Sequence, residues 1–236
     1  MTNSLLELSN LSIDVGERSI IRRLNLSIPS GETHVLLGAN GSGKSSILSA
    51  IMGLDPFKVV AGQIRFKGDD LQPLTTDERA RLGIGLAFQR PPRLEGVTSY
   101  AFATALRAQE VFGREAPRLK LSEFADRDLM VGFSGGETKR WEVMKLFLQS
   151  PDLLLLDEPE SGVDLEHIAT IGEAINRLTD SRGDRSALII THTGLILDHL
   201  DADVGHILAD GHIVHTGDPK TLFRHIQQAG YAAPAA

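Results

Sequence analysis

Residues 38–46 have the sequence GANGSGKSS, in which three glycines precede a lysine and two serines. The spacing G-x-x-x-x-G-K-S, between a predicted strand over 33–37 and a predicted helix over 44–52, is that of a phosphate-binding loop. Backbone N–H groups of such a loop point at phosphate oxygens, and the following helix adds positive charge from its N-terminus. A glycine-rich surface turn would not explain the strand and helix on either side. The sequence therefore predicts a nucleoside triphosphate site that uses Gly38, Asn40, Gly41, Ser42, Gly43, Lys44, Ser45 and Ser46.

Two carboxylates follow a second apolar run, LLLLDE, at residues 153–158. We expect Lys44 to reach the β- and γ-phosphates and the Ser45 hydroxyl to bind Mg²⁺. Asp157 would then hold the same Mg²⁺, and Glu158 would polarise or deprotonate the attacking water. Strands often end in solvated acids, but this pair lies downstream of a phosphate loop, which favours the catalytic interpretation.

Gln89 and His192 each follow a further predicted strand. A single glutamine is most often a surface residue, and a single histidine is most often structural. Because the carboxyl ends of parallel strands share one sheet edge, both side chains are predicted to meet the acid pair there. We expect Gln89 to contact Mg²⁺ and the attacking water, and His192 to contact the γ-phosphate.

A second anion site is predicted at FSGGE, residues 133–137, which begins a helix. Ser134 is a suitable N-cap, and Gly135 and Gly136 leave the first N–H groups of the helix uncovered. A plain capped helix start is the alternative. One nucleotide does not need two such sites in one chain, so we expect two chains to face each other, with Ser134, Gly135, Gly136 and Glu137 of each closing the other's phosphate loop.

These residues require an α/β frame. Alternating apolar residues predict strands over 5–15 and 20–28, joined by a turn at Gly16 and Glu17, and further strands over 63–68 and 84–88. Helices are predicted over 99–113 and 135–150. The second half of the chain is predicted to follow in the order strand 152–158, helix 166–179, strand 186–192, helix 194–200 and strands 204–210 and 212–217, with a frayed tail over 229–236.

Composition limits the function classes. The chain has 236 residues, 42% of them hydrophobic, no cysteine and a net charge of -7. Disulfides and thiolate metal ligands are therefore excluded within the chain. The negative charge argues against a nucleic-acid-binding surface. No apolar run is long enough to span a membrane and no signal peptide opens the sequence, so we expect a cytoplasmic protein without membrane insertion.

With these motifs in order, the sequence resembles the ABC-type ATPases along essentially its whole length. Residues 38–45 match the Walker A motif, Gln89 the Q-loop, 134–137 the signature, 153–158 Walker B, SGVD at 161–164 the D-loop and His192 the switch histidine. The resemblance implies a single ABC ATPase domain over 1–236. This domain would have a P-loop NTPase core (1–90 and 150–236), N-terminal antiparallel β-strands and an inserted α-helical subdomain (about 91–149). It also implies nucleotide contact by Asp164.

Within this family the chain is most similar to the SufC group, the ATPase subunits of the SUF iron–sulfur cluster assembly system. GFSGGETKRWE resembles the SufC signature, although Thr138 and Trp141 depart from it, and Glu160 replaces the threonine usual in transporter ATPases. The resemblance implies ATP and Mg²⁺ as cofactors, an ATP-dependent homodimer and a SufB/SufD-like scaffold partner. It also implies a groove for a scaffold helix, bordered by Arg93, Leu94 and Tyr100. The alternatives are the nucleotide-binding subunit of a membrane ABC transporter and an ATP-gated clamp that does not hydrolyse ATP.

Overall fold

The computed structural model of the protein describes residues 4–180 and 183–231. A six-stranded sheet lies at its centre, and every neighbouring pair in it is parallel except β11 and β12. The strands, in spatial order, are β12 (His212–Gly217), β11 (Val204–Ala209), β3 (Thr33–Leu37), β10 (Ser186–Thr191), β9 (Leu153–Asp157) and β6 (Ile84–Ala87). The parallel strands therefore bring the chain segments that follow them to one edge.

A second, antiparallel sheet has the order β2 (Arg18–Pro29), β1 (Ser4–Val15), β4 (Phe57–Phe66) and β5 (Asp69–Asp70). Helix α1 (Lys44–Met52) packs with both sheets in one hydrophobic core that contains Leu6, Ile47 and Leu155. The two predicted N-terminal strands and their turn are confirmed. The strand predicted over 63–68 is longer, since it starts at Phe57, and it ends at Phe66.

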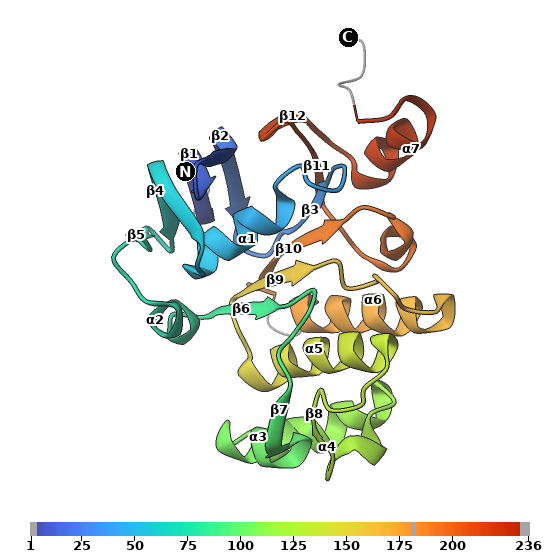
Figure 1. Ribbon diagram of the computed structural model, residues 1–236. Coiled ribbons are helices and arrows are strands. Elements are labelled where there is room, and N and C mark those ends of the chain that lie inside the picture. Colours follow the sequence, from blue (N-terminus) through green and yellow to red (C-terminus); the bar gives the residue numbers. More distant parts are fainter. Residues whose placement is uncertain (1–3, 181–182, 232–236) are drawn as a thin grey trace.

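Helices cover the other face of the central sheet (Figure 1). Helix α6 (Leu165–Asp180) lies next to the sheet, α5 (Gly135–Gln149) next to α6, and α4 (Gln109–Arg118) beyond α5. A second core, with Trp141 and Ile171 buried, joins these helices to the sheet. The helices predicted over 135–150 and 166–179 are confirmed as α5 and α6.

The single helix predicted over 99–113 is wrong. The chain forms α3 (Ser99–Ala105) and α4, separated by Arg107, whose φ is 55°. The turn places Phe102 and Phe112 on opposite sides of the break, and the centroids of both rings lie 6.2 Å from that of Trp141. A continuous helix would not bring both rings onto one tryptophan, so packing overrides local helical preference. The predicted helical block also contains a small hairpin, β7 (Leu94–Thr98) with β8 (Asp128–Leu129).

Four further elements also differ from the sequence-based expectation. The helix predicted over 194–200 is a 3₁₀ turn, Leu195–His199, and a second 3₁₀ turn covers Ser122–Phe124. Helices α2 (Thr76–Arg81) and α7 (Pro219–Ala229) were not predicted, although both carry start signals. A capping box at Thr75 begins α2, and Asp218 followed by proline begins α7. Of the tail predicted to fray, 232–236 lies outside the described residues.

Within the described ranges, none of the helices is both long and apolar enough to cross a membrane.

Two buried histidines occupy adjacent strands at one side of the central sheet. His34 Nδ1 lies 3.0 Å from His206 Nε2, and the chain of contacts continues to Glu32 at 2.8 Å and Thr216 at 2.9 Å. Burial, together with the neighbouring His34, lowers the pKa of His206 to about 4. His206 is therefore neutral at neutral pH.

Because of buried His206, we expect the folded protein to lose stability in acid. Unfolded His206 takes up a proton near pH 6.5, but the folded form does so only near pH 4, so the free energy of unfolding falls as pH drops through that window. The His206→Gln variant is expected to lose less stability, by up to about 3 kcal/mol, between neutral pH and pH 4. Urea titrations across this range, with exposed His212→Gln as the matched control, test it. Parallel pH profiles for wild type and His206→Gln would contradict it.

Candidate active site

The phosphate loop lies between β3 and α1, as predicted. Gly41 and Gly43 have φ angles of 81° and 102°, which favour glycine. A Cβ at Gly38 would come within 2.6 Å of the Leu208 carbonyl oxygen, so the loop also needs a glycine where it meets β11. Gly43 caps α1 without a side-chain hydrogen bond, which leaves the first N–H groups of the helix available.

Lys44 lies folded over this loop. Its Nζ donates to the carbonyl oxygens of Gly38 at 2.7 Å and Ala39 at 2.9 Å, and the residue is only 5% exposed. Burial lowers the pKa of Lys44, while the carboxylates of Glu158 and Asp157 act in the opposite direction. A cation held in this way is available to a phosphate that enters the loop.

Asp157 ends β9 directly beside the start of α1. The Ser45 hydroxyl donates to its carboxylate at 3.0 Å, and burial raises the pKa of Asp157. These two oxygens come from different elements and converge on one point. Mg²⁺ in nucleotide sites commonly takes one or two protein oxygens and completes its shell with phosphate and water, so this pair fits the ion.

Glu158 lies at the centre of a cluster of polar side chains formed with Gln89 and His192. Gln89 Nε2 donates to its Oε2 at 2.6 Å, and His192 Nδ1 lies 2.9 Å from its Oε1. Glu158 is 6% exposed and has a φ of 49°. Gln89 and His192, which follow the strands on either side of β9, thus meet at the Glu158 carboxylate, as the shared sheet edge predicted.

Two buried residues beside this cluster were not predicted as part of the site. Glu160 accepts hydrogen bonds from the hydroxyls of Thr191 and of Thr193, the latter at 2.9 Å, and these threonines flank His192. Burial raises the pKa of Glu160. Lys139 donates to the main-chain oxygen of Asp157 at 3.2 Å. The acid at position 160 was the available signal, since it departs from the transporter pattern.

A cavity of about 690 Å³ lies over the phosphate loop, and it collects most of the predicted residues. Lys44, Gln89, Glu158 and His192 line it together with Val15, Arg18, Ile20 and Phe57 of the antiparallel sheet. Its size is within the range of small-molecule sites. The lining therefore joins a phosphate-binding end to an apolar end.

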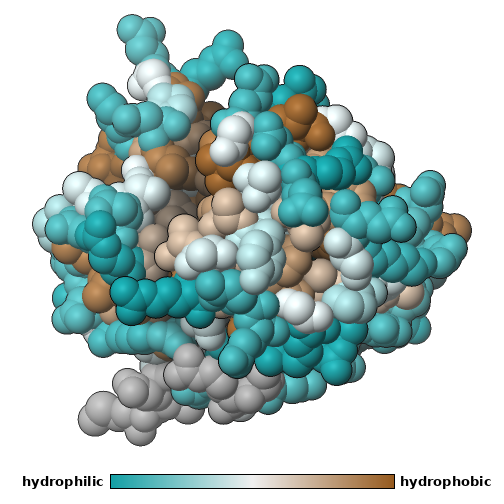
Figure 2. Space-filling view, turned by 90° about the horizontal axis from the view of Figure 1, so that it is seen from below, coloured by the Kyte–Doolittle hydropathy of each residue, from teal (hydrophilic) through white to brown (hydrophobic). Residues whose placement is uncertain are grey.

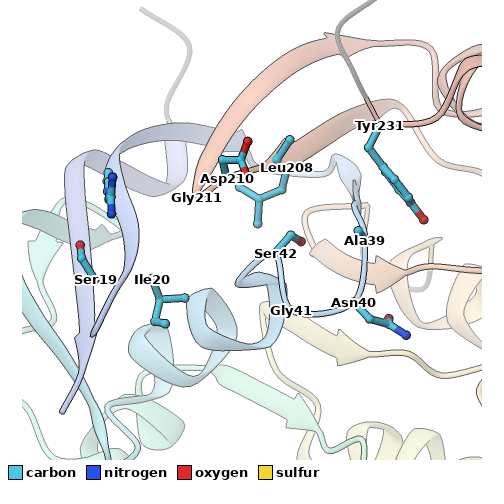
Figure 3. A pocket seen from close by; sticks show the side chains of 12 residues that line it. Ser19, Ile20, Ala39, Asn40, Gly41, Ser42, Leu208, Asp210, Gly211 and Tyr231 are labelled. Carbon is cyan, nitrogen blue, oxygen red and sulfur yellow. The ribbon is translucent and has the colours of Figure 1, made fainter. Parts of the chain in front are cut away.

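A neighbouring cavity of about 740 Å³ lies on the other side of Asn40 and Gly41 (Figure 3). Ser42, Ala39 and Tyr231 are among the residues that border it. Asn40 and Gly41 line both cavities, so the loop separates them.

The second predicted anion site lies apart from the first. The Ser134 hydroxyl accepts from Glu137 N at 3.3 Å, and the Glu137 carboxylate accepts from Ser134 N at 2.7 Å, which makes a capping box. Among the described residues that line the phosphate-loop cavity, none belongs to 134–137, and Asp164 is also not among them. Ser134, Gly135 and Asp164 are exposed instead.

The sequence profile of the ABC transporter family matches residues 21–161. The chain is 36% identical over 244 aligned residues to "Probable ATP-dependent transporter SufC" of Escherichia coli (strain K12), with 96% of this chain and 97% of the relative covered. It is 38% identical to "Probable ATP-dependent transporter ycf16" of Cyanidium caldarium, with 97% and 95% covered.

The chain belongs to the ABC transporter family and is an ABC ATPase. Solved structures agree on its fold. A nucleotide-free ATP-binding cassette from an ABC transporter superposes with a TM-score of 0.78 at 22% identity over 95% of both chains. A bacterial Atm1-family ABC exporter with ATP bound gives 0.80 at 19% identity, over 98% of this chain and 41% of the exporter. The predicted fold class of this ABC ATPase is therefore confirmed.

Proposed function

We propose that this ABC ATPase hydrolyses Mg-ATP in a closed homodimer and drives conformational change in an iron–sulfur cluster assembly scaffold. The observation that supports the proposal most is the similarity, over almost the whole of both chains, to the protein named SufC. The likeness also favours a SufB/SufD-like partner and a cytoplasmic location. We further propose one domain, with a nucleotide-binding core over 1–90 and 150–236 and a helical subdomain over about 91–149.

The residues of the phosphate-loop cavity suit hydrolysis. The loop N–H groups and Lys44 would bind the phosphates, and Ser45 and Asp157 would hold Mg²⁺. When bound, Mg²⁺ would offset negative charge on the phosphates. Glu158 would accept a proton from the attacking water, since it is buried and already orders two polar partners. Gln89 and His192 would orient that carboxylate, and His192 would contact the γ-phosphate.

The separation of Ser134 from the phosphate loop supports a site that two chains complete. Ser134, Gly135 and Gly136 lie at an exposed helix start, which binds anions well, and we propose that they meet the phosphates bound by a second copy, with Glu137 and Asp164 beside them. Glu137 would act mainly by holding the cap, because its carboxylate is bonded to Ser134 N.

This arrangement predicts dimerisation that depends on ATP. The Glu158→Gln variant is expected to run as a monomer without nucleotide and to double in mass with Mg-ATP, because ATP binds but is not cleaved. Light scattering after size-exclusion chromatography measures this. Adding Ser134→Glu to this variant should prevent the doubling in mass, because the glutamate carboxylate would face the triphosphate bound by the second copy. An increase in mass that survives Ser134→Glu would contradict the two-chain site.

We propose that the scaffold binds in a groove beside the Q-loop. A cavity of about 290 Å³ between β6, α5 and the Q-loop is lined by Phe88, Leu94, Phe102 and Trp141, among others. Figure 2 shows hydrophobic residues beside a hollow on the underside of the molecule, within a mostly hydrophilic surface. Leu94 is 40% exposed and Tyr100 48% exposed. Tyr100 packs against Phe112 outside this lining, and Arg93 lines a separate cavity beside Gln89.

The double variant Leu94→Glu/Tyr100→Glu is expected to keep the fold and ATP affinity but to weaken scaffold binding by about 100-fold or more, because it charges an apolar contact. Co-purification with the scaffold and its stimulation of ATPase activity measure this. The exposed Val60→Glu on the antiparallel sheet is the control. Wild-type binding and stimulation in the double variant would place the docking surface elsewhere.

The alternative is a nucleotide-binding subunit of a membrane ABC transporter, which the wording of the relatives' names favours. Purification from the native cell, with iron and sulfide analysis of the proteins that accompany it, separates the two. An iron–sulfur scaffold among them supports our proposal, and a membrane permease overturns it.

A further inference from the structure

A cavity on the far side of the molecule carries an unusual concentration of arginine. It measures about 520 Å³ and lies where α4 and the end of α5 meet the end of α6 and the start of β10. Four arginines line it, Arg114, Arg118, Arg177 and Arg185. The start of β10 is the opposite sheet edge from the phosphate loop, so this cavity is separate from the nucleotide site.

Three of these arginines share one buried carboxylate. Glu115 is 2% exposed, and its Oε1 lies 2.8 Å from Arg114 Nε and 3.3 Å from Arg118 Nη1. Its Oε2 lies 3.5 Å from Arg177 Nη2, which is an ion pair without a hydrogen bond. One carboxylate therefore faces three guanidinium groups, and Asp180 is the only other acid among the described residues that line the cavity.

Among the described residues of the lining, four arginines face two acids, which is an excess of two positive charges in a chain whose net charge is -7. Arg177 Nε and Nη2 are buried without a hydrogen-bond partner among the described residues. Arg114 and Arg118 have side chains 56% and 52% exposed, so their remaining N–H groups are accessible. A guanidinium carries five donors, and phosphate is the ligand that pairs with several at once.

The rest of the wall is apolar except for Ser150. Val111, Phe147 and Leu148 line the cavity, and the Arg177 guanidinium lies 5.8 Å from the centroid of the Phe147 ring. We propose that this cavity is a second ligand site that binds the phosphate group of a small organic molecule, whose apolar part packs against Phe147 and Leu148. Such a ligand would connect α4, in the helical segment, to α6 and β10 of the central sheet, and so restrain one against the other.

The test is an NMR titration of the full chain with inorganic phosphate and then with phenyl phosphate, at constant ionic strength. The side-chain Nε–H signals of Arg114, Arg118 and Arg177 report this cavity alone, so binding at the phosphate loop does not interfere. We expect saturable shifts with a phosphate Kd of the order of 1 mM, about −4 kcal/mol, and tighter binding of phenyl phosphate. The exposed Arg81 signal should not saturate.

Matched variants test the assignment. Arg118→Gln keeps the Arg114–Glu115 contact and is expected to weaken phosphate binding at the Arg177 signal about tenfold, or about 1.4 kcal/mol. Arg81→Gln should leave the binding unchanged. Shifts that never saturate in the wild type, or equal affinity in wild type and Arg118→Gln, would overturn the site. Equal or weaker binding of phenyl phosphate would overturn the apolar part of the proposal. The wild-type titration decides the outcome even where a variant does not fold.

Discussion

Replacing Glu158 by glutamine is expected to lower ATP turnover by about 10²- to 10⁴-fold while leaving ATP affinity near that of the wild type. Glutamine keeps the size of the side chain and one oxygen for Gln89, but it cannot accept a proton from water. The carboxylate lies over the phosphate loop, 2.6 Å from Gln89 Nε2 and 2.9 Å from His192 Nδ1. The loss should therefore appear in kcat and not in binding.

Single-turnover hydrolysis and direct nucleotide titration, carried out on the same preparation, separate the two quantities. Glu173→Gln, on the exposed face of α6, is the matched control because it removes the same charge away from the site. Turnover in Glu158→Gln within a few-fold of wild type would move the role of the base to another residue.

Replacing Lys44 by alanine is expected to weaken ATP binding by about 100-fold or more, or about 2.8 kcal/mol. The ammonium group is buried, and in this structure it is bonded to the carbonyl oxygens of Gly38 and Ala39. Alanine removes the cation that would offset the triphosphate charge, and it leaves those two carbonyls without this donor.

Calorimetric titration with Mg-ATP measures this loss. Lys220→Ala, on the exposed side of α7, is the control for general charge loss. A thermal melt without nucleotide checks that the loop variant is folded. Affinity like that of the wild type in a folded Lys44→Ala protein would contradict the assignment of the phosphate loop.

The charges of Lys44, Asp157 and Glu158 interact with one another in the nucleotide-free protein. Burial lowers the pKa of Lys44 and raises that of Asp157, and each of the two groups opposes the shift of the other. Removal of Lys44 would leave Asp157 and Glu158 with less compensation for their burial. Part of the effect of Lys44→Ala is therefore expected in the acid pair as well as in the phosphate contacts.

Several elements were readable from local sequence because their causes are local. The phosphate-loop strand and helix have the predicted bounds, 33–37 and 44–52, since the glycine spacing marks both ends. Ser134 begins α5 as expected, because a cap and its partner lie three residues apart. The break at Arg107 was missed, because it depends on Trp141, which is distant in the sequence.

The sequence by itself determined the family, the fold class and the order of motifs, because each motif is a run of adjacent residues whose geometry is set locally. The tertiary structure alone decided that Gln89 contacts Glu158, 69 residues later, and that Glu160 holds the threonines on both sides of His192. It also decided that three arginines surround Glu115. Such contacts depend on which strands and helices lie side by side, and that is settled by packing of the whole core.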